Sequence, residues 1–83
     1  MDRKRYFAMV PIPRPSFLDR QERLGFKHGA PRWRSEDGKR LYEWDHRHGH
    51  IEVYTRRGVH LGTLDPITGI RIGDPVKGRR VDV

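Results

Sequence analysis

The chain has 83 residues, which allows one domain with a single small hydrophobic core. It contains no cysteine, which excludes disulfide bonds and thiolate metal sites and fits action in the reducing cytoplasm. Its residue order offers neither a signal-peptide core nor a membrane-spanning stretch, so no membrane partner is expected. The formal net charge of +7 indicates a polyanionic partner, most commonly nucleic acid, with a merely solvated basic surface as the alternative.

The N-terminal part of the chain is expected to form an arm followed by a short helix. Alternating prolines within residues 1–15 forbid a helix there and favour extended backbone. Ser16 is a good helix N-cap, and the pattern that follows predicts a short helix ending at Gly25. We therefore divide the chain into an arm with its helix, residues 1–30, and a functional domain, residues 31–83.

Beyond an irregular segment at residues 29–34 and a turn at Asp37-Gly38, apolar residues recur with a period of two, which is typical of β-strands. The connections are too short to join anything but antiparallel neighbours, so we predict a small, mainly β protein built as a twisted meander. The predicted strands are Lys39–Asp45, His50–Thr55, Val59–Leu64 and Ile70–Ile72. Alternation predicts one buried face with Tyr42, Trp44, Ile51 and Val53, and an opposite face with Glu43, Asp45, Glu52 and Tyr54.

The segment of residues 44–54 concentrates carboxylates, imidazoles and a phenol. If the chain bends within it, Asp45 and Glu52 become diagonal neighbours at roughly 7 Å, with His48 at the mouth of the hairpin. Such a patch suits RNA cleavage without a metal or cofactor. Glu52 takes the proton of the ribose hydroxyl, His48 protonates the departing oxygen, and Asp45 orients His48.

Cleavage also needs cations that stabilise the phosphorane. Arg79 and Arg80 in the C-terminal tail are our candidates, because a planar guanidinium grips two phosphate oxygens at once. Further contacts with the substrate are expected at positions 33, 54, 71 and 77, which are Trp33, Tyr54, Arg71 and Lys77.

A metal-dependent nuclease is the first alternative. His46, His48 and His50 alternate along the chain, which would place three imidazoles on one strand face, and zinc or nickel accepts such ligands readily. A solvated hairpin with incidental histidines is the plainest explanation of the same pattern. His28 and His60 are expected on polar faces without a function.

A non-catalytic RNA-binding or ribosome-binding module is the second alternative. The positive charge together with Trp33, Trp44 and Tyr54 would suffice for it, because aromatic rings stack on unpaired bases. The carboxylate of Glu52 distinguishes the two classes, since a pure binder gains nothing from an acidic group on its contact face.

The stretch from Trp33 to Tyr54, with GKRLYEWDHRHGHIEVY at its centre, resembles the cytotoxic ribonuclease domain of the rRNA-cleaving E-group colicins and related contact-dependent toxins. The likeness continues through GVHLGTLDPITG and Gly73-Asp74-Pro75. It implies a highly twisted antiparallel β-sheet with a short N-terminal helix. It also implies action on 16S ribosomal RNA in the decoding centre of the small ribosomal subunit, which halts translation.

The resemblance also implies roles for individual residues. The family's catalytic arginine follows an Asp-Pro pair, so its counterpart here is Lys77, Arg79 or Arg80, and the bidentate grip of arginine favours one of the last two. The catalytic aspartate, histidine and glutamate and the aromatic residue after them fall on Asp45, His48, Glu52 and Tyr54.

The E-group colicins carry receptor-binding and translocation regions ahead of this domain, whereas here a methionine stands a short distance upstream. We therefore expect either an excised toxin domain or a free-standing toxin. Any cell that makes such a protein needs protection, so we also expect an acidic immunity protein or antitoxin that covers the basic face.

Overall fold

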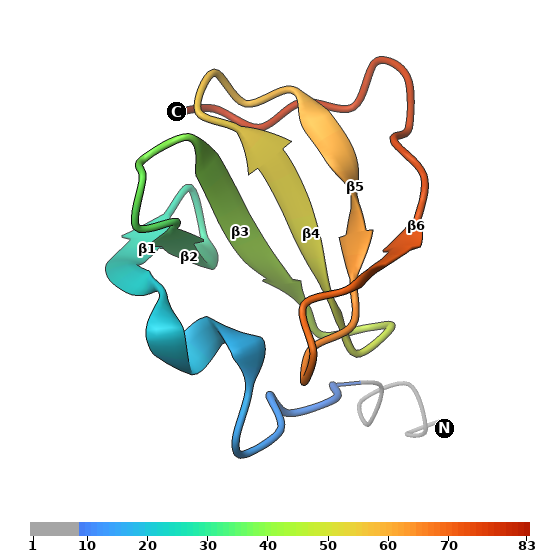
Figure 1. The fold of residues 1–83 in the computed structure, drawn as a ribbon. Coiled ribbons are helices and arrows are strands. Elements are labelled where there is room, and N and C mark those ends of the chain that lie inside the picture. Colours follow the sequence, from blue (N-terminus) through green and yellow to red (C-terminus); the bar gives the residue numbers. More distant parts are fainter. Residues whose placement is uncertain (1–8) are drawn as a thin grey trace, which may run out of the picture.

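The computed structural model describes residues 9–83. Six strands form one antiparallel sheet whose spatial order follows the chain, which confirms the predicted mainly β meander (Figure 1). The four predicted strands are all present, and two further strands precede them. The strands are β1 (Glu22–Lys27), β2 (Ala30–Arg34), β3 (Arg40–Asp45), β4 (His50–Thr55), β5 (His60–Leu64) and β6 (Arg71–Gly73).

The predicted helix from Ser16 to Gly25 is much shorter in the structure. Only one 3-10 turn forms, η2 (Phe17–Arg20), and it has the predicted N-cap: Ser16 Oγ accepts a backbone N–H at 3.1 Å, and the Ser16 N–H donates to Asp19 at 2.9 Å. The chain then extends into β1, which pairs with β2 where an irregular segment was expected. Pairing prevails because a helix of two turns is marginal on its own, whereas a hairpin satisfies the backbone of both strands.

The boundary expected between residues 30 and 31 falls inside β2, directly after its first residue Ala30, and both sides of it pair with β1, so the sheet continues across it. The first eight residues of the expected arm lie outside the described part of the chain. The part that follows is attached to the sheet: the Val10 N–H donates to the carbonyl oxygen of His46 at 2.7 Å, and Trp44 Nε1 donates to the carbonyl oxygen of Val10 at 2.9 Å. The arm therefore braces the turn between β3 and β4.

The hydrophobic core lies on one face of the sheet, against η2 and the arm. Phe17 of η2 meets Tyr42 edge-on, with ring centroids 5.3 Å apart. All four side chains predicted for the buried face belong to this core, which consists of Leu18, Trp33, Tyr42, Trp44, Ile51, Val53 and Leu64. The opposite face is therefore left to the polar side chains of β3 and β4.

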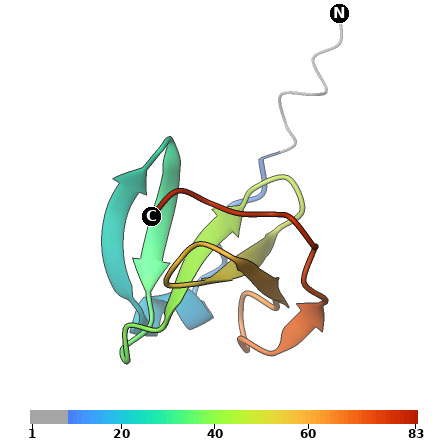
Figure 2. The same ribbon diagram turned by 90° about the horizontal axis from the view of Figure 1, so that it is seen from above.

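The sheet is strongly twisted, and the end of the chain runs back along it. Figure 2 shows the β1–β2 hairpin at a steep angle to the later strands. After β6 the C-terminal tail passes the β4–β5 turn and returns toward that hairpin, where Arg32 Nη1 donates to the carbonyl oxygen of Asp82 at 2.7 Å (Figure 1). Within residues 9–83 no helix has the length and apolar character needed to cross a bilayer.

Candidate active site

The chain reverses direction at residues 46–49, between β3 and β4, as predicted. The Gly49 N–H closes the turn on the carbonyl oxygen of Asp45 at 2.8 Å, and the φ of 74° at Gly49 is one that glycine readily adopts. The register pairs Asp45 with His50 and Glu43 with Glu52. Asp45 and Glu52 are therefore diagonal neighbours on the polar face of the sheet.

Asp45 holds His48 in place at the turn. Its Oδ1 accepts the backbone N–H groups of Arg47 at 3.0 Å and of His48 at 3.2 Å, and its Oδ2 lies 2.8 Å from His48 Nδ1. Partial burial opposes ionisation of Asp45, but the hydrogen bonds from the ring and amide of His48 and from the Arg47 amide outweigh it and lower the pKa of Asp45. Because the His48 side chain is 67% exposed, it remains accessible to a substrate.

Glu52 lies deeper in the same face, and its carboxylate is fixed by three donors. Oε1 accepts His60 Nε2 at 2.6 Å, Thr63 Oγ1 at 3.3 Å and Arg79 Nη1 at 3.3 Å. Oε2 lies 3.5 Å from His50 Nε2. The side chain is 11% exposed, and one of its oxygens is held by three donors while the other faces His50 at the start of β4.

His60 was expected to have no function, yet its side chain is fully buried against Glu52. The Val76 N–H donates to His60 Nδ1 at 2.9 Å, so the ring proton sits on Nε2 and is donated to Glu52. The ring of Tyr54 packs against it, with centroids 5.2 Å apart. The sequence does place His60 on the strand next to the one that carries Glu52. It does not reveal that the two side chains meet, because the register shifts between β4 and β5.

The structure separates the candidate cations. Arg79 reaches Glu52, whereas Arg80 Nη2 donates to a backbone carbonyl of the β4–β5 turn at 3.5 Å. Arg71 lines a cavity on the core face of the sheet, away from Asp45 and His48. Lys77 is exposed in the tail ahead of Arg79. Of the cations expected to stabilise the phosphorane, Arg79 is therefore the one that the fold brings to Glu52.

The aromatic residues expected to contact RNA are largely buried. Trp33 and Trp44 are 6% and 9% exposed and belong to the core on the opposite face, so neither indole presents a stacking surface beside Asp45. Tyr54 lies on the polar face under His60. Burial, together with the carboxylates of Glu43 and Glu52, raises the pKa of Tyr54 to about 12, so the phenol keeps its proton.

The three histidines considered as an alternative metal site are not the group that the turn assembles. His46 is exposed, and in its place Asp45 joins His48 and His50. One ligand atom from each of these three lies within 4.8 Å of the others, and residues 9–83 contain no other such group of three.

The profile of a protein family described as Cytotoxic matches residues 19–82, which is more than half of the chain and includes Asp45, His48, Glu52 and Arg79. The chain belongs to the Cytotoxic family. Colicin E3 of Escherichia coli is 41% identical over 51 residues, and colicin-E6 and cloacin of the same organism are each 39% identical over 51 residues. Each match covers 60% of this chain but only 9% of the relative's length. The resemblance to the cytotoxic domain of the E-group colicins is thereby confirmed.

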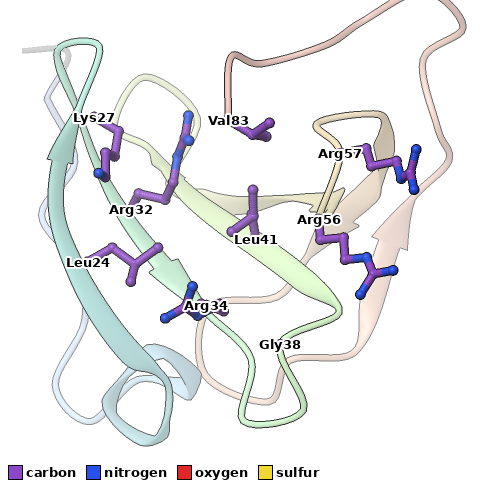
Figure 3. A pocket seen from close by; sticks show the side chains of 9 residues that line it. All are labelled: Leu24, Lys27, Arg32, Arg34, Gly38, Leu41, Arg56, Arg57 and Val83. Atoms are coloured by element: carbon purple, nitrogen blue, oxygen red, sulfur yellow. The ribbon is translucent and has the colours of Figure 1, made fainter.

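This cytotoxic domain also carries a basic pocket of about 560 Å³, whose lining side chains are drawn in Figure 3. Arg32, only 3% exposed, forms the inner wall and donates to Glu43 Oε2 at 2.7 and 3.0 Å. Because Leu41 and Asp45 alternate onto the same face of β3, the pocket and the turn lie on one surface. Apolar Leu24, Leu41 and Val83 line the pocket together with cationic Lys27, Arg34, Arg56 and Arg57.

Proposed function

We propose that this cytotoxic domain is a metal-independent endoribonuclease that cleaves 16S ribosomal RNA in the decoding centre and so halts translation. One observation carries the chemistry: Asp45, which holds the exposed imidazole of His48, is the diagonal neighbour of Glu52 on the polar face. The Glu52 carboxylate is itself oriented by His60 and has the guanidinium of Arg79 at 3.3 Å. The resemblance to rRNA-cleaving colicins supplies the substrate, and the net charge of +7 supports a polyanion.

The reaction is an internal transphosphorylation. Glu52 Oε2 takes the proton of the ribose 2′-hydroxyl, and the 2′-oxygen attacks the adjacent phosphorus. As the bond from phosphorus to the 5′-oxygen breaks, His48 gives its proton to that leaving oxygen. The products are a 2′,3′-cyclic phosphate and a 5′-hydroxyl, and no metal or cofactor takes part.

Three further side chains support these steps. Asp45 keeps the His48 ring in one orientation and stabilises its protonated form through the 2.8 Å contact with Nδ1. Arg79 stabilises the extra negative charge of the phosphorane, which builds up next to Glu52. His60 acts as a positioning residue, because its single ring proton fixes Oε1 of Glu52 and leaves Oε2 for the substrate.

The basic pocket binds the RNA backbone that flanks the scissile phosphate. Its floor at Leu41 lies four residues along β3 from Asp45, or ~13 Å at ~3.3 Å per residue. Lys27, Arg56 and Arg57 can neutralise phosphates at that distance, and the apolar floor suits a base or ribose. The pure binding module loses support in comparison, because the indoles it needs are in the core.

An acidic immunity protein or antitoxin is the partner that fits the same basic surface, and the cytoplasm of a target cell is where the domain acts. Complementary charge gives such an inhibitor fast association and specificity. Its binding over the polar face would block access of the ribosome.

Digestion of intact ribosomes by the purified chain, with and without a strong chelator, tests the proposed function. We expect one discrete fragment of the small-subunit RNA, formed at the same rate in both samples. Intact RNA in both samples would refute the ribonuclease, and a heterogeneous ladder would refute its site specificity. Loss of cleavage on chelation would instead favour the metal-dependent alternative.

A further inference from the structure

The group formed by Asp45, His48 and His50 offers a chemistry that the proposed reaction does not use. We propose that these three side chains form a binding site for Zn²⁺, and that the bound ion switches the nuclease off. The ligand atoms are Asp45 Oδ2, His48 Nδ1 and His50 Nε2. The binding half of this proposal depends only on the geometry of the turn, whereas the inhibitory half rests on the proposed function.

The spacing of these atoms suits a zinc ion. Zinc bonds to imidazole nitrogen and carboxylate oxygen are ~2.0–2.2 Å long, so ligand atoms at a tetrahedral ion lie roughly 3.3–3.5 Å apart. Asp45 Oδ2 lies 2.8 Å from His48 Nδ1 and 3.5 Å from His50 Nε2. All three atoms lie within 4.8 Å of one another, so an ion can enter among them after shifts of about an ångström, most of them in the exposed His48 ring.

The protein holds these ligands in place before an ion arrives. Asp45 Oδ1 is occupied by the amides of Arg47 and His48, which turns Oδ2 toward both imidazoles. His50 is fixed opposite Asp45 by the register of β3 and β4. The rings of His48 and His50 stack with centroids 5.5 Å apart and planes at 9°, so both imidazoles lie beside Asp45, and the exposed His48 ring has to rotate to aim its nitrogen at a shared ion. Ligands ordered in this way lose little entropy on binding.

The fourth coordination position has a candidate as well. Glu52 Oε2 lies 3.5 Å from His50 Nε2, which places a second carboxylate at the edge of the group. Two imidazoles with one or two carboxylates are ligands that zinc accepts readily, and an open position would take water. His50 Nε2 lies 3.5 Å from Asp45 Oδ2 and 3.5 Å from Glu52 Oε2. A divalent cation at this point would offset the repulsion between the two carboxylates.

A zinc ion bound at this site would take His48 and Asp45 away from the cleavage reaction. Zinc on Nδ1 takes the lone pair through which His48 would be protonated, so the ring can no longer supply an acidic proton to the leaving oxygen. The ion also takes Asp45 Oδ2 away from its orienting role. Cells or compartments with high free zinc would thus hold the domain inactive, and a chelator would restore it.

Binding is tested first, without RNA, by calorimetric titration of the tag-free chain with Zn²⁺ and by the visible absorption of Co²⁺ as a probe. The matched variants are His50→Gln, which removes a ligand, and His46→Gln, which removes an exposed histidine of the same turn. We expect one ion per chain, an affinity at least ~10–100-fold lower in His50→Gln, and no change in His46→Gln. Equal affinity in the two variants, or no tetrahedral Co²⁺ spectrum in the unaltered chain, would overturn the site.

The inhibitory half is tested by the ratio of ribosome cleavage with and without Zn²⁺, measured separately for each protein. We expect cleavage by the unaltered chain and by His46→Gln to fall at least tenfold and to recover on chelation, while His50→Gln responds much less. If zinc binds but cleavage rises, the inhibitory role is wrong and the metal-dependent nuclease gains support. If zinc binds as expected but no sample cleaves ribosomes, the proposed function fails while the metal site stands.

Discussion

Glu52→Gln and His48→Ala each lower the rate of ribosome cleavage by on the order of 10²–10⁴-fold while leaving ribosome binding nearly unchanged. The reason is that each variant removes one proton-transfer group. Gln has nearly the shape of Glu52 and can still contact its neighbours, but its amide takes no proton from a hydroxyl. His48 is exposed at the turn, so its loss leaves the core intact. Single-turnover cleavage and equilibrium binding to ribosomes, measured side by side, separate the two effects.

The matched control is His46→Ala, which removes an imidazole from the same turn without touching Asp45 or Glu52. Its cleavage rate should stay within a few-fold of the unaltered chain. An unchanged rate in Glu52→Gln or His48→Ala would remove the acid–base assignment. Tighter ribosome binding by Glu52→Gln together with unchanged cleavage would point to the non-catalytic binding module.

Arg79→Ala should lower the cleavage rate by on the order of 10²–10³-fold, because Arg79 is the guanidinium within 3.3 Å of Glu52 and close to the developing phosphorane. Arg80→Ala is the matched control: it removes the same charge from the next position, where the side chain reaches a carbonyl of the β4–β5 turn instead. Its cleavage rate should change only a few-fold, through weaker binding. Single-turnover rates at saturating enzyme compare the two variants directly.

Arg79→Lys sharpens this comparison, since it keeps the charge but loses the bidentate geometry. We expect it to recover only part of the lost rate. A larger loss in Arg80→Ala than in Arg79→Ala would show that the tail binds RNA in a different arrangement from the one in the free domain. The role of phosphorane clamp would then pass to Arg80.

The part of the fold that follows from local sequence could be predicted. Turn residues and a period of two located β3 to β6, and alternation identified the core face with Tyr42 and Trp44. The reversal at residues 46–49 followed from the chemistry of the turn, and with it the diagonal placement of Asp45 and Glu52. These features depend on residues close together in the chain, whose preferences agree with the final structure.

The features that could not be predicted depend on contacts between residues far apart in the chain. Residues Glu22–Lys27 carry helix-compatible side chains, and only pairing with β2 makes them a strand. The burial of His60 depends on a register shift and on a hydrogen bond from Val76, a residue sixteen positions away. The choice between Arg79 and Arg80 depends on the path of the tail over the end of β5, which leaves no local signature in the sequence.

The chemical identity of the new RNA ends tests the central claim most directly. A reaction in which Glu52 and His48 move protons and the 2′-oxygen is the nucleophile leaves a 2′,3′-cyclic phosphate on one fragment and a 5′-hydroxyl on the other. Mass spectrometry of the terminal oligonucleotides from a short digest in chelator should find these two ends. A 5′-phosphate with a free 3′-hydroxyl would show that water was the nucleophile and would contradict the account.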